Sequence, residues 1–222
     1  MTKTGEAARP TVADEDRSVA DLARDYGRNI AIGLIALAAA AGIYIAYAKA
    51  KASKADKAES AYASAQRSAM TGNPALAQSD LKKVVGRYEG TAAATRAQIL
   101  MAELLFDEGK FAEGMAELDR ASKSGPPDEL KPTIEILRAA GLEEQQKFAD
   151  AAASYLKAAE ASRFENDKLK LRADAARAYT EAGNKAEARK IWEELAKDQN
   201  SPVAGEARVR LGELTATPSA RG

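Results

Sequence analysis

Two pairs of adjacent glutamates, Glu143-Glu144 and Glu193-Glu194, have the residue types that come nearest to a catalytic acid and base. General acid–base catalysis needs titratable groups within reach of one substrate. Consecutive residues of an α-helix point about 100° apart, because one turn takes about 3.6 residues. The carboxylates of each pair would therefore diverge, and we expect them to be solvated side chains on helices.

The composition removes most other kinds of catalysis. The chain has 222 residues with no cysteine and no histidine, which excludes Cys–His pairs, Ser-His-Asp triads and almost every zinc, haem or iron–sulfur site. Its glycines stand singly rather than in a phosphate-binding loop. The 33 basic and 33 acidic side chains cancel, so no net charge attracts nucleic acid. We predict a protein that is not an enzyme and has no cofactor, metal or small-molecule substrate.

One helix is expected to cross a membrane. Residues 29–48 read NIAIGLIALAAAAGIYIAYA, without a charge, between Arg28 and Lys49. At about 1.5 Å per residue such a helix spans roughly 30 Å, the hydrocarbon core of a bilayer. Tyr44 and Tyr47 lie where aromatic rings settle among the headgroups. The alternatives are a cleaved signal peptide and a buried helix, but the acidic residues upstream and the length of the run favour an uncleaved anchor.

The segments beside this helix are polar. Residues 1–28 form a predicted polar tail, and residues 215–222 a predicted disordered one. Four basic residues in 9–28 stand against five in 49–68, so the positive-inside rule does not decide which side of the membrane each segment occupies. Just beyond the apolar run are lysines that could contact phospholipid headgroups: Lys49, Lys51, Lys54 and Lys57.

Residues 49–214 repeat with a period of 37 residues. Turn-like sequences recur at positions 72, 109, 146 and 183, with glutamine at 146 and glycine at the other three. A small residue stands seven positions before each turn and another five after it, and a large residue follows four positions later. These residues are Ala65, Ala102, Ala139 and Ala176, then Ala77, Gly114, Ala151 and Ala188, then Leu81, Leu118, Tyr155 and Trp192.

This pattern predicts helical hairpins. A small residue on each helix lets two backbones approach closely, the large residue fills the space beside them, and the turn residue joins the helices. In the second unit we expect helices over 92–108 and 111–123. Tyr155 and Trp192 occupy the large position and are expected to pack in the core.

Helix breakers mark the later units. Gly125-Pro126-Pro127-Asp128 is expected to precede a helix with Pro132 in its first turn. Asn166-Asp167 are expected to precede the fourth unit. Ser201-Pro202 is expected to begin a last helix, over 202–214, that covers the exposed face of the final hairpin.

The repeated frame resembles the tetratricopeptide repeat, whose usual period is 34 residues. The resemblance rests on Ala102, Gly109, Phe111, Gly114 and Leu118 and on their equivalents in the later units. Together with the apolar run of residues 29–48, it implies an all-α fold, in which a single N-terminal transmembrane helix is followed by an α-solenoid of about four helical hairpins and a capping helix.

The order of the parts resembles the bacterial inner-membrane tetratricopeptide-like proteins that serve as ancillary subunits of the Sec translocon. The resemblance covers about residues 21–214. It implies a cytoplasmic N-terminus, a periplasmic repeat domain, and a role in protein export or folding with translocon subunits, a membrane-bound periplasmic chaperone and exported chains. The residues leave open a second reading, a membrane-anchored scaffold for another envelope or cytoplasmic assembly.

Stacked hairpins form a concave groove lined by the first helix of each unit, and such grooves bind helices or extended peptides. Repeats that grip a carboxylate terminus have lysine and asparagine at four of these positions, where this chain has Ile99, Glu103, Ile136 and Ala140. We therefore expect a protein partner with apolar side chains. We also expect Phe106→Ala and Arg177→Glu to weaken partner capture without unfolding the domain. The groove-facing positions of the repeat fall on Tyr62, Arg96, Ile99, Glu103, Phe106, Ile136, Ala140, Lys170, Ala173 and Arg177.

Overall fold

The computed structural model describes residues 19–199 and 201–215. Within these residues the regular elements are helices, and no strand occurs. The chain divides into two compact units, Met1–Lys51 and Ala52–Gly222, and each is described by itself.

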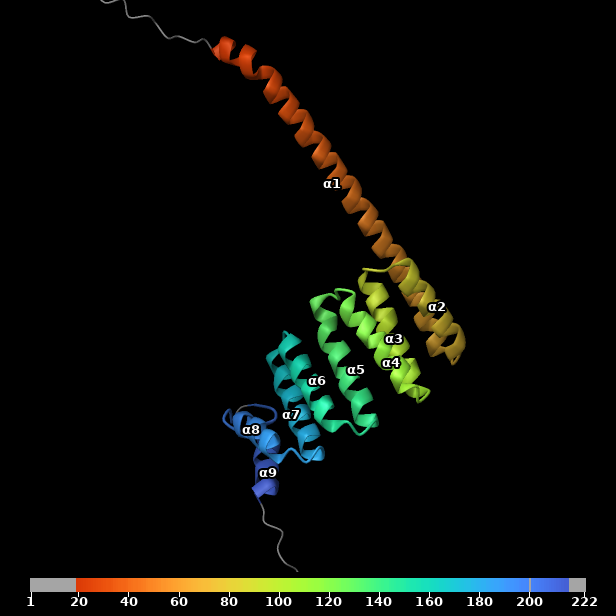
Figure 1. Ribbon diagram of the computed structural model, residues 1–222, viewed down its shortest axis with the longest axis vertical. Coiled ribbons are helices and arrows are strands. Elements are labelled where there is room, and N and C mark those ends of the chain that lie inside the picture. The colour runs from red at the N-terminus through yellow and green to blue at the C-terminus, as the bar shows by residue number, and fades with distance from the viewer. Residues whose placement is uncertain (1–18, 200, 216–222) are drawn as a thin grey trace, which may run out of the picture. The chain divides into compact units, whose positions relative to one another are not determined.

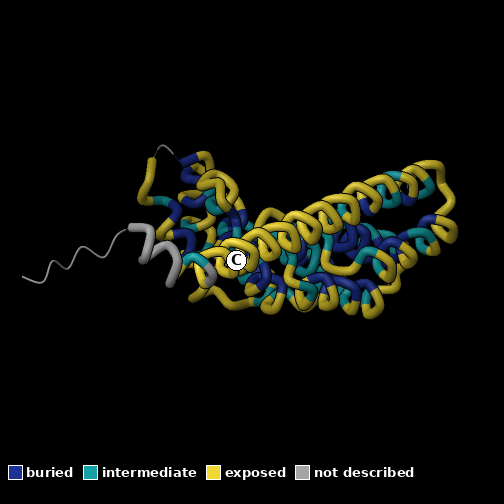
Figure 2. The backbone as a smooth tube through the Cα atoms, turned by 90° about the horizontal axis from the view of Figure 1, so that it is seen from above, coloured by how far each residue is buried: buried dark blue, intermediate teal, exposed yellow. Residues whose placement is uncertain are grey.

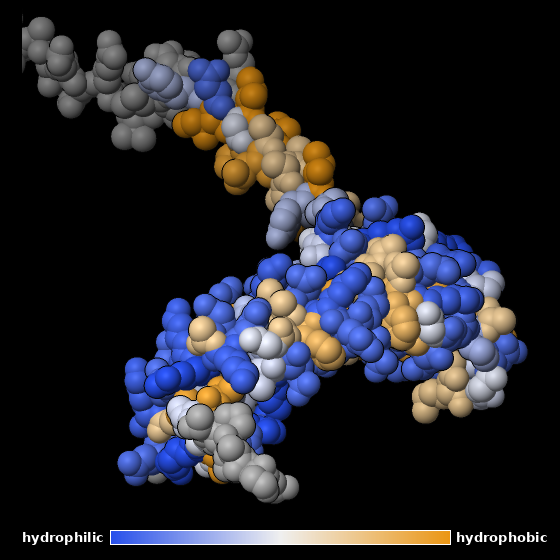
Figure 3. Space-filling view, turned by 60° about the horizontal axis from the view of Figure 1, so that its bottom comes forward, coloured by the Kyte–Doolittle hydropathy of each residue, from blue (hydrophilic) through white to orange (hydrophobic). Residues whose placement is uncertain are grey.

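Helix α1, Val19–Met70, is continuous. Its apolar run is exposed throughout, with Ile35 and Leu37 each 70 % exposed, and it is drawn in yellow in Figure 2 and in orange in Figure 3. The mean hydropathy of this apolar run reaches 2.2, and none of the run is buried. Among the described residues this one helix is long and apolar enough to cross a membrane. The helix begins before the apolar run, so residues 19–28 of the predicted tail are helical, while residues 1–18 lie outside the described part.

The second unit is a series of helical hairpins. Helices α3 and α4, α5 and α6, and α7 and α8 pack as pairs, and the pairs lie side by side in Figure 1. The final helix, α9, packs on α8. The predicted all-α repeat fold is therefore confirmed. After α1 come α2 (Pro74–Arg87), α3 (Ala92–Asp107), α4 (Phe111–Lys123), the 3-10 helix η1 (Asp128–Leu130), α5 (Lys131–Glu144), α6 (Phe148–Ala161), α7 (Glu165–Glu181), α8 (Lys185–Leu195) and α9 (Ala204–Thr215).

Each turn within a hairpin closes in the same way. At the last one, the Gly183 N–H donates to the Thr180 carbonyl at 3.0 Å and the Asn184 N–H donates to the Tyr179 carbonyl at 2.8 Å. The same two bonds recur after α1, α3 and α5. They satisfy helix carbonyls that have no partner within the helix, and they require a left-handed residue. Gly72, Gly109 and Gly183 supply it with φ of 74° to 76°.

Gln146 occupies the same turn position with φ of 59°, although it carries a side chain. The left-handed conformation costs a residue with a Cβ about 1–2 kcal/mol, partly offset by the greater freedom of glycine in the unfolded chain. Gln146→Gly is therefore expected to raise the free energy of unfolding by about 0.5–1 kcal/mol, measured by urea denaturation. The matched change Gly183→Gln should lower it, and a shift of both variants in the same direction would contradict this explanation.

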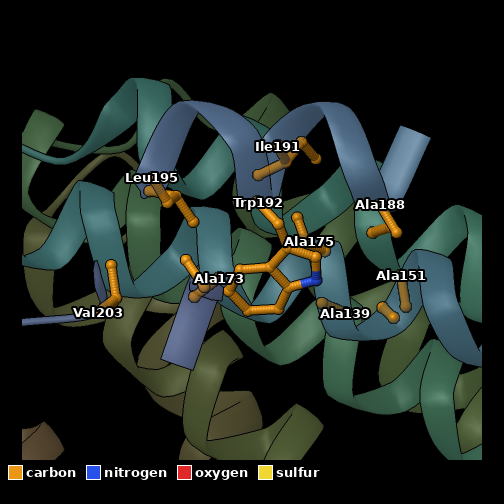
Figure 4. Close-up of a cluster of buried hydrophobic side chains, with 13 residues drawn as sticks. Ala139, Ala151, Ala173, Ala175, Ala188, Ile191, Trp192, Leu195 and Val203 are labelled. Atoms are coloured by element: carbon orange, nitrogen blue, oxygen red, sulfur yellow. The ribbon is translucent and has the colours of Figure 1, made fainter. Parts of the chain in front are cut away.

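The core follows the 37-residue frame. Ala65, Ala102, Ala139 and Ala176 are fully buried, as are Ala77, Ala151 and Ala188 in the facing helices, and Gly114 is buried as well. At the large position Leu81, Leu118 and Trp192 are fully buried. Figure 4 shows the Trp192 indole among small side chains such as Ala139, Ala175 and Ala188. The prediction that small residues allow close helix approach while large residues fill the remaining space is confirmed.

Tyr155, at the large position of the third unit, is half-buried rather than enclosed. Its hydroxyl donates a hydrogen bond of 3.1 Å to the Glu143 carboxylate. Burial and then the negative charge of Glu143 raise the pKa of the Tyr155 phenol well above its ordinary value. Tyr155 therefore packs as predicted, with its polar end bonded at the surface.

Two predicted unit boundaries are wrong by a few residues. Helix α7 begins at Glu165, so Asn166-Asp167 lie in its first turn, where acidic residues suit the helix dipole. Helix α9 begins at Ala204 rather than Pro202, because Ser201 and the two residues after it form a turn in which the Ser201 Oγ accepts from the Val203 N–H at 3.4 Å. The break at Gly125-Pro126-Pro127 and the first-turn proline of α5 are confirmed.

Candidate protein-binding groove

A hollow of about 400 Å³ lies between the beginnings of α5 and α7, beside the loop that joins α6 to α7. Ile136 of α5 and Lys170 of α7, both predicted for the groove, line it together. The other apolar lining residues include Pro132, Phe164 and Leu171. We call this site the Ile136 hollow. Its apolar floor suits side chains of a protein partner.

Phe164 is the exposed aromatic residue of this site. It is 65 % exposed, and its backbone is fixed because its N–H donates to the Ser162 Oγ at 3.3 Å. An aromatic ring held in the open beside an apolar hollow is typical of interaction surfaces. The groove prediction missed Phe164 because it follows positions within the first helix of each unit, and Phe164 lies in the loop between units.

The rim of the Ile136 hollow carries both signs of charge. Asp128 pairs with Lys131 at 2.5 Å, and the hydrogen bond from Lys131 holds the pKa of the Asp128 carboxyl below its ordinary value. Glu129, Asp167 and Lys170 have no ion pair with the described residues. A partner segment can therefore pair with either sign at the rim.

Arg177 is close to this rim but is occupied by the protein itself. Its guanidinium donates to the Glu206 carboxylate of α9 at 2.6 Å and pairs with Asp174 on its own helix. Arg177 thus joins α7 to the capping helix. Because a glutamate here would face two carboxylates, Arg177→Glu is expected to disturb the fold, contrary to the sequence-based expectation.

A second group of predicted residues gathers where α1 meets α3. The Arg96 guanidinium lies over the Tyr62 ring, 5.5 Å from its centroid, and pairs with Glu59. Burial is the main cause that raises the pKa of the Tyr62 phenol, and the charge of Arg96 opposes it. Glu103 adds its charge to the same group. The sequence placed Tyr62, Arg96 and Glu103 on one face, and the structure brings them together.

Glu103 makes the stability of this group depend on pH. Burial, and after it the charge of Asp107, raise the pKa of the Glu103 carboxyl above 4.5. The folded chain therefore binds a proton at the Glu103 carboxyl more readily than the unfolded chain does. The stability that this bound proton contributes is present at low pH and is lost as the pH rises above about 4.5. The free energy of unfolding of Glu103→Gln, measured by urea denaturation, should exceed that of the parent at about pH 7. The difference should vanish at about pH 4. An equal difference at both pH values, or the same effect from Glu144→Gln at the exposed Glu144, would contradict the assignment.

Ile99 and Phe106 differ from the prediction. Ile99 is 7 % exposed and packs with Ala102, Leu118 and Ile134, so it does not reach the groove. The Phe106 ring is half-buried and lies against two glycines. Residues of α4 and of the next hairpin's α5 cover both side chains. The contacts from α5 come from repeat stacking rather than from one repeat's pattern.

Two small predicted residues contribute little to a groove surface. Ala173 is fully buried in the core of the later repeats. Ala140 is half-buried on α5. The predicted groove thus divides into the Tyr62–Arg96 group, the Ile136 hollow and residues that pack within the domain.

The adjacent glutamates are largely engaged with other side chains. Glu193 accepts from Arg189 on its own helix at 2.8 Å, while Glu194 pairs with Arg172 on α7. Glu143 accepts the Tyr155 hydroxyl. Within residues 19–199 and 201–215, no group of histidine, cysteine, aspartate and glutamate side chains could hold a metal ion. These carboxylates serve the fold through their contacts.

The hairpins and the groove define a class, the helical-repeat scaffolds of tetratricopeptide type. The chain belongs to the tetratricopeptide repeat-like domain family, whose model matches residues 23–215. A fold of this class typically serves as a non-enzymatic scaffold that binds other proteins. A comparison with curated proteins finds no match to this chain.

Two solved structures share the fold. One contains nearly identical TPR-like repeats assigned to a kinesin light chain of Podosopora anserina, with 16 % identity over 71 % of this chain and 85 % of that chain and a TM-score of 0.54. The other is a glutamine-to-methionine variant of the same repeats, with 16 % identity over 71 % of this chain and 84 % of that chain and a TM-score of 0.53. At this identity the likeness concerns the helical-repeat fold.

Proposed function

We propose that this protein is a membrane-anchored protein-binding module that faces the periplasm and assists protein export or folding at the Sec translocon, together with a membrane-bound periplasmic chaperone. The N-terminus would be cytoplasmic, residues 29–48 would span the inner membrane, and residues 49–214 would form the repeat domain. Of the predicted tail, residues 215–222, Thr215 ends α9 and the other residues lie outside the described part of the chain.

One observation carries the membrane part of this proposal. The apolar run is exposed along its whole length, and α1 continues from it without interruption into residues that pack in the first repeat, such as Ala65. The family match also begins ahead of the apolar run, at residue 23. Exposure of so many apolar side chains to water would be unfavourable. These features support an uncleaved anchor as part of the functional unit rather than a removable leader.

The Ile136 hollow supports the protein-binding part. Phe164, Ile136 and Lys170 offer an aromatic ring, an apolar floor and a charge at one place. Individual contacts of this kind are weak. An anchor that keeps the groove near membrane partners raises their effective concentration, so that weak contacts suffice.

A site-specific crosslinking experiment tests the function. A photoreactive phenylalanine analogue placed at Phe164 of the full-length chain in membranes should crosslink translocon subunits, the chaperone or exported chains. The same analogue at Val209, an apolar residue of α9 that is 61 % exposed, is the matched control. Equal products at both positions would reject the hollow as the binding site, and products from another assembly would reject the translocon role.

A further inference from the structure

A separate hollow of about 420 Å³ lies where the end of α2, the beginning of α3 and the end of α4 meet. Its lining includes small residues, such as Gly86 and Ala94, that leave room near the backbone. Gln98 reaches it from α3, and Arg120 and Lys123 reach it from α4. We call this site the Gln98 hollow. It shares no lining residue with the Ile136 hollow.

Gln98 is buried without a hydrogen-bond partner. The residue is 6 % exposed, and its side-chain amide makes no hydrogen bond with the described residues although it lines the hollow. The amide is not one of the enclosed side-chain atoms without a partner, so water reaches it through the hollow. A ligand in the hollow that accepts a hydrogen bond from this amide would replace that water.

The charges around the hollow indicate the sign of the ligand. Lys123 is exposed and has no ion pair among the described residues. The Arg120 guanidinium uses one nitrogen on Glu117 at 2.5 Å, and its other N–H groups remain available. Glu89 is the opposing carboxylate in the lining. Two cations and an amide donor at the opening of the hollow favour a ligand that is negatively charged and accepts hydrogen bonds.

In the fourth repeat a hollow lined by Arg172 is also present, and the positions equivalent to Gln98 and Arg120 pair with each other there. The positions two periods after Gln98 and Arg120 are Arg172 and Glu194, and Arg172 pairs with Glu194 there. A carboxylate of the chain itself thus satisfies the donor in the fourth repeat. In the second repeat both positions carry donors, so neither supplies a carboxylate to the other.

We propose that the Gln98 hollow binds a carboxylate side chain, from an aspartate or glutamate of a partner polypeptide. Such a contact would give the scaffold a second recognition point with a preference for acidic segments, in addition to the apolar preference of the Ile136 hollow. The proposal rests on the repeat fold and does not depend on the cellular compartment or on the translocon.

Nuclear magnetic resonance of the full-length chain in neutral detergent micelles tests this proposal. Side-chain ¹⁵N labelling of glutamine produces few signals, and Gln98→Met identifies that of Gln98. The probe is the peptide acetyl-Ala-Ala-Glu-Ala-Ala-amide, and its glutamine counterpart is the control. We expect the Gln98 signal to shift saturably with the glutamate peptide and at least about tenfold more weakly with the control, since a charge-assisted bond is worth about 1.5–3 kcal/mol.

Two matched variants sharpen the test. Lys123→Ala should weaken the response about tenfold, whereas Lys197→Ala, at the equivalent lysine of the fourth repeat, should leave it unchanged. Equal shifts with both peptides, no shift at the highest soluble concentration, or equal effects of Lys123→Ala and Lys197→Ala would overturn the proposal.

Discussion

Trp192→Ala is expected to lower the free energy of unfolding by about 3–5 kcal/mol, the usual cost of removing a large aromatic core side chain. Trp192 is fully buried, and its cluster draws residues from α5, α6, α7, α8 and the segment before α9. Its neighbours are mainly alanines, which cannot extend into the space that the indole would leave. Urea denaturation of the full-length chain in micelles, followed by circular dichroism, measures the loss.

Trp192→Phe is the matched control for this prediction. The indole Nε1 is buried with no hydrogen-bond partner among the described residues, so phenylalanine loses volume but also removes an unpaired donor. Its cost should stay below about 1.5 kcal/mol. If Trp192→Phe lowers the free energy of unfolding as much as Trp192→Ala does, Trp192 does not stabilise the domain by filling the space between small residues.

Gly141→Ala is expected to cost about 1–3 kcal/mol, although alanine is the better helix former. A Cβ added at Gly141 would lie 2.6 Å from the Phe106 Cζ, and one added at Gly114 would lie 2.5 Å from the Phe106 Cε1. The ring cannot retreat from one helix without approaching the other. Urea denaturation measures the cost. The control is Gly86→Ala, because no neighbouring side chain or other helix lies within 4 Å of a Cβ added there. This variant should raise the free energy of unfolding by about 0.5–1 kcal/mol.

A double-mutant cycle isolates the role of Phe106. Phe106→Ala alone should cost about 2–3 kcal/mol, less than a fully buried phenylalanine because the ring is half-buried. In that background Gly141→Ala should no longer be costly, giving a coupling of at least about 1 kcal/mol. Additive effects would show that the ring does not fill the space between the two glycines. The expectation that Phe106→Ala does not unfold the domain stays a prediction.

The hairpins could be predicted from the sequence because their causes are local and periodic. Ala102, Gly109 and Leu118 each act within one hairpin, where helix periodicity and turn chemistry decide the structure. The 37-residue frame therefore located the turns and the core positions. Gln146 departs from the frame in residue type but keeps its left-handed backbone, which shows that the hairpin geometry overrides the local preference.

The groove was harder to predict because it depends on how hairpins stack. Ile99 and Phe106 occupy groove positions of the repeat, yet α4 and α5 provide residues that cover them. Arg177 is held by Glu206 from a helix outside the repeat frame. Phe164 and Gln98 matter because of a loop conformation and an unfilled junction. Such features depend on contacts between units, which no single repeat's pattern encodes.

We propose that the repeat domain is held at the membrane and faces the periplasm. Protease accessibility of the C-terminally tagged full-length protein, compared between intact spheroplasts and lysed cells with an internal cytoplasmic control, tests it most directly. We predict that the repeat domain is digested in intact spheroplasts while the cytoplasmic control survives. Protection of the repeat domain until lysis would contradict the claim and would make a cytoplasmic membrane-tethered scaffold the better account.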